Sequence, residues 1–243
     1  MSCEIVYEIL LILLGYFCGS IPVAYLIGKI RYGIDIREHG SGNMGTANVL
    51  RTLGKKAGLT TLVLDMLKGT IAVLCARFYL WFGNYSYFGT DSTSGFPLTL
   101  DEGFFLALVA FMTIIGHSFP VWLKFRGGKS AAVGAGAMLG INPIAWAVIM
   151  FIWFFLLKFT KLMSLSNLTV TLISMPFYWY FGGSGNGFFG NQSLWALIVS
   201  AVMVVFIYWR HRANIKRLLT GTERKMGQKV DIEKENESKT EAS

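Results

Sequence analysis

The chain has 243 residues, of which 53% are hydrophobic and 15% are charged, and its formal net charge is +8. Because soluble globular domains carry about 25% charged residues, this composition argues against an ordinary soluble domain and is typical of a membrane protein. The three cysteines stand at unrelated spacings, which predicts neither a metal site nor a disulfide framework: Cys3, Cys18 and Cys75.

The first predicted membrane span covers residues 5–27, with a kink expected where residues 19–22 read Gly-Ser-Ile-Pro. Two acidic residues, Glu4 and Glu8, lie at its start, and no Lys or Arg precedes it. Six cations follow it between residues 29 and 56. The positive-inside rule therefore predicts an external N-terminus and a cytoplasmic loop after the first span.

Later apolar runs predict further spans over residues 59–82, 104–123, 131–159, 168–181 and 194–209. The 131–159 run is expected to form two short helices, because Asn142-Pro143 favours a turn and because two crossings bring the following cations to the cytoplasmic side. The loops at 83–102 and 182–193 contain no cation and are expected outside.

The predicted fold class is an all-α integral membrane protein. It has about seven transmembrane helices, two of them short, with the N-terminus outside and the C-terminus in the cytoplasm. Residues 1–227 are expected to form a single polytopic membrane domain. Residues 228–243 mix acidic, Lys and Ser residues without apolar periodicity, which predicts a disordered cytoplasmic tail.

The stretch over residues 116–136 leaves the third span and carries paired glycines, Gly127 and Gly128, directly before Lys129. Adjacent glycines let backbone N–H groups approach a ligand, and a neighbouring lysine adds a full positive charge. These are the parts of a phosphate site, although a membrane anchor with a glycine turn fits the same residues equally well. The stretch is not a Walker A loop, because Leu123 stands where that motif requires glycine.

The predicted topology gathers four polar clusters on the cytoplasmic side, at residues 40–51, 124–130, 160–167 and 211–214. Each cluster alone could be a solvated loop. Together they supply cations, hydroxyls, amides and glycine turns, which are the groups that bind phosphate oxygens. No cluster has the density of acidic and histidine residues that a metal centre needs, so no metal or other cofactor is expected.

Among the ionisable residues inside the predicted spans, three lie deep enough to need a reason. His117 is interpreted as a hydrogen-bonded core histidine, with proton handling as the alternative. Asp65 and Lys68 lie three positions apart on one helix, so they are expected to form a structural pair. Lys68 could alternatively face the cytoplasmic cavity.

Several ordered motifs resemble those of the bacterial membrane glycerol-3-phosphate acyltransferases that use acyl phosphate as donor, the PlsY family. The resemblance covers residues from about 10 to 227 and rests on the segments at residues 41–51, 116–121, 127–129, 160–166, 211–215 and 221–223. Three departures from the family pattern stand out: Met44 replaces a proline, Ser130 a glycine and Leu162 an aromatic residue. Thr46 and Ala47 also reverse a pair of small residues.

The resemblance implies an acyl-phosphate:glycerol-3-phosphate acyltransferase, which moves a fatty acyl group to the 1-hydroxyl of glycerol 3-phosphate and yields lysophosphatidic acid. It implies catalytic roles in positioning and charge stabilisation for Lys129, Arg51, Ser164 and His211. It implies substrate binding by these four residues together with Ser41, Asn43, Gly127, Gly128 and Asn214. No side-chain base is assigned, because no histidine is followed by Asp five positions later.

The implied partners are acyl phosphate, glycerol 3-phosphate, membrane lipid and, as a further candidate, the enzyme that makes acyl phosphate; nucleic acid is not expected. The implied location is the bacterial cell membrane, with a multi-pass chain and an active site facing the cytoplasm. A transporter or channel for organic phosphates is the alternative, although no internal repeat of the kind common in transporters is visible. A non-catalytic membrane scaffold would leave the four clusters unexplained.

Overall fold

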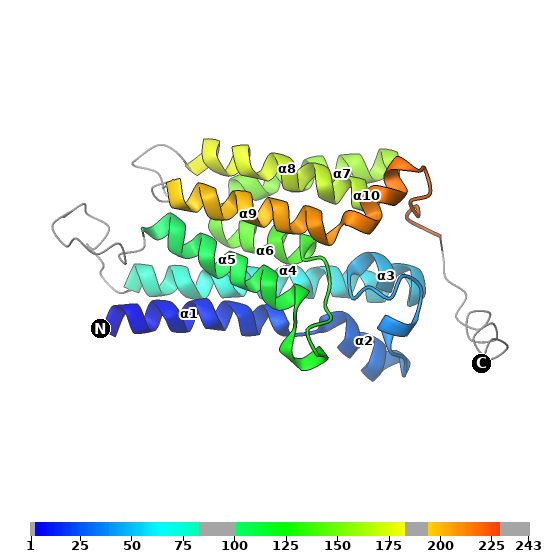
Figure 1. The fold of residues 1–243 in the computed structure, drawn as a ribbon, viewed down its shortest axis with the longest axis horizontal. Helices are drawn as coiled ribbons and strands as arrows, with labels where there is room; N and C mark the ends of the chain where they lie inside the picture. Colours follow the sequence, from blue (N-terminus) through cyan, green and yellow to red (C-terminus); the bar gives the residue numbers. More distant parts are fainter. Residues whose placement is uncertain (1–2, 83–100, 183–193, 229–243) are drawn as a thin grey trace.

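The computed structural model describes residues 3–82, 101–182 and 194–228, and every regular element within these ranges is a helix. The main helices run side by side along the long axis of the molecule (Figure 1). In chain order the elements are α1 (Cys3–Ser20), α2 (Val23–Tyr32), η1 (Ile36–Glu38), α3 (Thr46–Thr52), α4 (Lys55–Phe82), α5 (Glu102–Ser118), η3 (Val121–Leu123), α6 (Ala131–Ile141), α7 (Pro143–Thr160), α8 (Met163–Gly182), α9 (Leu194–Arg210) and α10 (Arg212–Leu219).

The two predicted helix breaks are confirmed. The first span is interrupted between α1 and α2, where Pro22 precedes the second helix. The 131–159 run divides at Asn142, whose side chain caps α7 by accepting a hydrogen bond of 2.9 Å from the backbone N–H of Ala145. Proline at the first position of α7 is compatible with a helix start, because it lacks only an N–H that would have no partner there.

Four segments of the described chain are long and apolar enough to cross a membrane: Ile5–Tyr32, Lys55–Trp81, Glu102–Leu123 and Pro143–Thr160. The pair α9 and α10, bent by 62°, adds a fifth by length and composition. The count of seven spans therefore stays a prediction. The predicted external loops and the tail fall almost wholly on residues 83–100, 183–193 and 229–243, outside the described residues.

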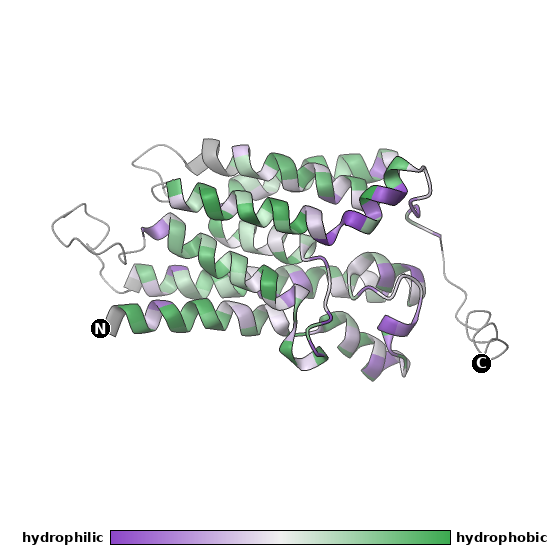
Figure 2. Cartoon of the chain, viewed as in Figure 1, coloured by the Kyte–Doolittle hydropathy of each residue, from purple (hydrophilic) through white to green (hydrophobic). Residues whose placement is uncertain are grey.

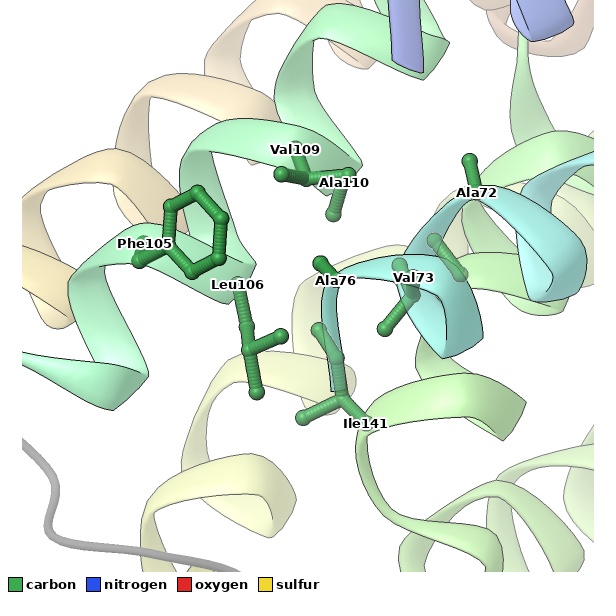
Figure 3. Packing of buried hydrophobic residues seen from close by; sticks show 9 residues of the cluster. Ala72, Val73, Ala76, Phe105, Leu106, Val109, Ala110 and Ile141 are labelled. Carbon is green, nitrogen blue, oxygen red and sulfur yellow. The ribbon is translucent and has the colours of Figure 1, made fainter. Parts of the chain in front are cut away.

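Close helix contacts in the bundle depend on small residues. A Cβ atom at Gly136 of α6 would lie 1.8 Å from the carbonyl oxygen of Met66 in α4, and one at Gly69 would lie 2.3 Å from that of Val133. Glycine and other small residues let membrane helices approach closely. The resulting van der Waals packing drives helix association in lipid, where the hydrophobic effect does not. The buried apolar cluster beside this contact joins α4, α5 and α6 and includes Val73, Phe105 and Ile141 (Figure 3).

Hydrophilic residues concentrate at one end of the bundle, where α10, η1 and the loop before α6 lie (Figure 2). The first residues of α1 lie at the opposite end (Figure 1). Two helices at the hydrophilic end, α3 and α10, were not expected from the sequence. Both are short and contain too few apolar residues to be predicted as membrane spans. They carry two of the four predicted polar clusters, those at residues 40–51 and 211–214, to the same end as the loop before α6.

Candidate active site

A cavity of about 410 Å³ lies at the hydrophilic end of the bundle and is lined by residues from all four predicted clusters. Seven of the nine predicted site residues line it: Ser41, Asn43, Arg51, Lys129, Ser164, His211 and Asn214. Residues from clusters that lie far apart in the sequence therefore line one cavity. Gly127 and Gly128 are not among the residues that line the cavity.

The segment before α3 is shaped by Asn48, which is 1% exposed. The Asn48 side-chain amide donates to the carbonyl oxygens of Ile36 (3.2 Å) and His39 (3.0 Å). Its oxygen accepts from the backbone N–H of Ser41 at 2.8 Å. This side chain therefore fixes the turn that presents Ser41 to the cavity, while α3 presents Arg51.

The loop before α6 is held between two helices. The N–H groups of Gly127 and Gly128 donate to the carbonyl oxygens of Ser118 (3.1 Å) and His117 (3.0 Å). The Arg210 guanidinium of α9 donates to the carbonyl of Gly127 at 3.0 Å and to that of Gly128 at 2.7 Å. The expected role of the two glycines as amide donors to a phosphate is thus corrected, because both N–H groups already have acceptors.

Ser130 stands where the family pattern has glycine, and its backbone explains the preference. Its φ is +64°, in the left-handed region that favours glycine. The side chain is nevertheless accommodated: it is 2% exposed, and its hydroxyl lies 2.7 Å from that of Ser118 and donates to the carbonyl of Ile114 at 2.8 Å. The serine thus gains two hydrogen bonds at a position that a side chain strains.

Glu223 is the centre of a polar network. This residue belongs to the last motif of the resemblance, at residues 221–223, but no role was predicted for it from the sequence. One carboxylate oxygen accepts from the Ser164 hydroxyl at 2.7 Å and from the Asn214 amide at 2.8 Å. The other accepts from Arg217 at 2.8 Å. Burial alone would raise the pKa of Glu223, but the hydrogen bonds from Ser164, Asn214 and Arg217 outweigh it and lower that pKa below its ordinary value.

Lys129 lies in the cavity and donates a hydrogen bond to the side-chain oxygen of Asn214. Burial is the main cause that lowers the pKa of Lys129 to about 8, with the cations Arg217, Arg51 and Arg210 acting in the same direction. Glu223 opposes them. An anionic ligand in the cavity would stabilise the protonated form of Lys129, because it would offset the surrounding positive charge.

His211 is 2% exposed, and burial is the main cause that lowers its pKa to about 4. Its Nδ1 lies 2.8 Å from the carbonyl oxygen of Ile207. Because a carbonyl only accepts, Nδ1 carries the proton and Nε2 carries the lone pair. His211 is therefore a neutral imidazole at physiological pH and a weak base.

The Arg51 guanidinium supplies a donor without an acceptor. Its Nε is buried and has no hydrogen-bond partner among the residues that the structure describes. A buried unpaired donor is unfavourable, so the site fits a ligand with acceptor oxygens. Arg217 and Arg224 also line the cavity, which gives it an excess of cations over its two acids, Asp65 and Glu223.

A second, apolar cavity of about 110 Å³ adjoins the first. The two cavities share Ala131, Ala135, Ile149, Val170 and Thr171 in their walls. The rest of the apolar cavity is lined mainly by aliphatic and methionine side chains from α5, α6, α8 and α9. The site therefore combines the first cavity, a cation-rich chamber, with an adjoining apolar cavity.

Within the described part of the chain, no group of three or more His, Cys, Asp or Glu residues is arranged to hold a metal ion.

The comparisons with known proteins agree with one another. A family model described as glycerol-3-phosphate acyltransferase matches residues 9–221. The chain is 39% identical over 218 residues to a glycerol-3-phosphate acyltransferase from Thermosynechococcus vestitus, which covers 90% of this chain and 94% of the relative. It is 41% identical over 219 residues to one from Listeria monocytogenes, covering 90% and 96%.

Two crystal structures of PlsY, an integral membrane glycerol 3-phosphate acyltransferase, resemble the chain. The glycerol 3-phosphate form superposes with a TM-score of 0.74 at 31% identity and covers 91% of this chain and 96% of that one. The lysophosphatidic acid form gives a TM-score of 0.72 at 30% identity, with the same coverage.

Proposed function

The chain belongs to the glycerol-3-phosphate acyltransferase family, and from this premise we propose that its cavity transfers a fatty acyl group from acyl phosphate to the 1-hydroxyl of glycerol 3-phosphate. Glycerol-3-phosphate acyltransferase activity is the function of this membrane enzyme, with glycerol 3-phosphate as a substrate. The alternative of an organic-phosphate transporter has no support among the relatives. The donor, the residue roles and the orientation are the proposed parts.

The observation that carries the proposal is the partly uncompensated positive charge of the cavity. Arg51 has a buried donor without a partner in the described part of the chain, and burial among cations lowers the pKa of Lys129 to about 8. Both features are relieved when phosphate oxygens occupy the chamber. Ser41, Asn43 and Asn214 line the same chamber and supply further polar contacts.

The adjoining apolar cavity suits the other part of the donor. A fatty acyl chain is stabilised by apolar surface at about 25 cal/mol per Å². The shared wall of the two cavities would hold the carbonyl carbon between the chain and the phosphate. In this arrangement the acyl chain lies among the spans and both head groups lie in the polar chamber.

The chemistry proposed is a direct displacement. The 1-oxygen of glycerol 3-phosphate attacks the carbonyl carbon of acyl phosphate, the new C–O bond forms, and the bond from that carbon to the phosphate oxygen breaks. Inorganic phosphate leaves and carries the hydroxyl proton on one of its oxygens. Lys129 and Arg51 stabilise the charge on the departing phosphate, so positioning and electrostatics supply the rate enhancement.

The proposed orientation places this chamber in the cytoplasm. The loop at residues 29–56, the loop before α6 and the α10 segment carry the cations that the positive-inside rule assigns to that side. Soluble glycerol 3-phosphate is then accessible from the same compartment. A soluble enzyme that makes acyl phosphate would also deliver its product on this side.

The test is a product assay. Purified protein in lipid nanodiscs is incubated with palmitoyl phosphate and radiolabelled glycerol 3-phosphate, and lipid products are separated by thin-layer chromatography. We expect labelled lysophosphatidic acid from the wild type and little from Lys129→Ala. Lys216→Gln, which changes an exposed cation outside the cavity, is the control and should match the wild type. A wild-type preparation without a lipid product would refute the proposal.

A further inference from the structure

Three ionisable side chains meet inside the bundle, beside the cation-rich chamber. Asp65 and Lys68 of α4 and His117 of α5 have side chains that are 2%, 5% and 8% exposed. Charged groups at membrane depth are unfavourable unless they are paired, and they usually have a functional reason. Asp65 and His117 also line the chamber that contains Lys129.

The contacts of Lys68 fix the state of His117. The Lys68 ammonium lies 2.8 Å from Asp65 Oδ1, donates to the carbonyl of Ile21 at 2.8 Å and lies 2.9 Å from His117 Nδ1. An ammonium group has three donors and no acceptor, so Nδ1 must accept. The proton of the neutral His117 ring is then on Nε2.

The other side of the His117 ring supports the loop that carries Lys129. A Cβ atom at Gly128 would lie 2.0 Å from His117 Nε2, which shows how closely the ring packs beneath that glycine. The His117 carbonyl accepts from the Gly128 N–H at 3.0 Å. The glycine at position 128 is therefore needed for this close approach, and the residue that follows it is Lys129.

We infer that Asp65, Lys68 and His117 form a positioning cluster that seats the Gly127–Gly128 turn and keeps Lys129 in the chamber. The inference rests on the proposed phosphate role of Lys129. His117 does not accept the substrate proton, because Lys68 occupies the lone pair of Nδ1 and Nε2 already carries hydrogen. These three residues act through the loop.

The position of the loop has a measurable electrostatic consequence. The charged and titratable groups that face Lys129 are Arg51 of α3, Arg210 of α9, His211 before α10, Arg217 of α10 and Glu223 after it. Burial among these groups lowers the pKa of Lys129 to about 8. If the loop is displaced, Lys129 becomes better solvated and its pKa rises toward the ordinary lysine value of about 10.4. The alkaline limit of activity then moves to higher pH.

The test compares two substitutions of similar size in the full-length protein in nanodiscs. His117→Leu removes the acceptor for Lys68, whereas His117→Asn can offer its side-chain oxygen near the position of Nδ1. For His117→Leu we expect KM for the phosphate substrates to rise about tenfold or more, because a small misplacement of a binding group is that damaging. We also expect its alkaline limit to move upward, and His117→Asn to recover part of both effects.

A charge-neutral variant covers the case in which His117→Leu fails to fold. Asp65→Asn with Lys68→Met removes the ion pair without leaving a buried unpaired charge, so the protein should still insert. The same rise in KM and the same shift of the alkaline limit are expected. Thr61→Val, at another buried position on α4, is the control and should change neither.

Two outcomes would overturn the inference. Unchanged KM and an unchanged alkaline limit in His117→Leu and in the double variant would show that the cluster only stabilises the fold. A fall in kcat of about a thousandfold at unchanged KM would instead identify His117 as the proton acceptor. Failure of the proposed phosphate role of Lys129 is seen separately, as activity of Lys129→Ala equal to that of the wild type. Failure of the proposed function is seen as a wild-type preparation that forms no lipid product.

Discussion

Lys129 donates a hydrogen bond to Asn214, 85 positions later in the chain, and so joins the loop before α6 to helix α10. Asn214 in turn donates to Glu223, which also accepts from Ser164 at the start of α8. This part of the chamber wall is therefore a single hydrogen-bonded unit built from three separate segments.

Replacing Lys129 should affect activity far more than stability. Lys129→Ala removes a charge-assisted contact to phosphate worth about 1.5–3 kcal/mol, which lowers kcat/KM by roughly 10- to 150-fold. Lys129→Arg keeps the charge and should lie between the alanine variant and the wild type. Initial rates measured at matched, size-exclusion-verified protein levels check this. Activity of Lys129→Ala equal to the wild type would rule out the phosphate role.

The pH profile of the wild type should fall on its alkaline side near pH 8. Burial lowers the pKa of Lys129 to about 8, so raising the pH through that value removes the charge that binds phosphate. The acidic side should instead follow substrate phosphate ionisation near pH 6, because the low pKa of His211, about 4, keeps that residue neutral throughout. The profile of kcat/KM between pH 5 and 10 is the measurement.

Lys129→Arg provides the matched control for the alkaline limit. Arginine stays protonated over the whole range, so its profile should remain flat above pH 8 even if the rate is lower. An alkaline fall at the same pH in both proteins would assign the limit to another group.

Glu223 should be energetically coupled to Ser164. Its carboxylate accepts from Ser164 at 2.7 Å, so removing either side chain breaks the same contact. We expect the activity losses of Ser164→Ala and Glu223→Ala to combine with a non-additivity of about 0.5–3 kcal/mol. A double-mutant cycle on kcat/KM measures this. Strict additivity would show that the two residues act independently.

The sequence predicted those parts of the structure that depend on local pattern. The break at Asn142-Pro143 and the kink before Pro22 follow from turn chemistry, and hydropathy locates the long spans. The convergence of Ser41, Lys129 and Asn214 followed from topology, because all were assigned to one side of the membrane. Short polar helices such as α3 were missed because they carry no long apolar run.

Contacts between distant residues were beyond the sequence. Paired glycines predict a tight turn, but the direction of their N–H groups depends on α5, whose carbonyls accept both. The Asp65–Lys68 pair was expected from helix spacing and is confirmed by a distance of 2.8 Å. That Lys68 also meets His117, at 2.9 Å, depends on how α4 packs against α5.

The orientation can be tested by thiol labelling. Single cysteines at Lys56 and Lys216 are expected to react with a membrane-impermeant maleimide only from the cytoplasmic side, and one at Glu102 only from outside. The background lacks the native thiols, with Ser at Cys3, Cys18 and Cys75. Both Lys56 and Lys216 are exposed in the structure. Labelling of Lys56→Cys and Lys216→Cys from opposite sides would contradict the proposal that both positions lie on the cytoplasmic side.

Donor choice tests the central claim most directly. Purified protein in nanodiscs is given labelled glycerol 3-phosphate with equal concentrations of palmitoyl phosphate or palmitoyl-CoA, and lysophosphatidic acid and inorganic phosphate are measured together. We predict rapid turnover with palmitoyl phosphate, one phosphate released for each lysophosphatidic acid formed, and little product with palmitoyl-CoA. Equal rates with the two donors, or an acylated protein trapped during turnover, would contradict direct transfer from acyl phosphate in the cation-lined chamber.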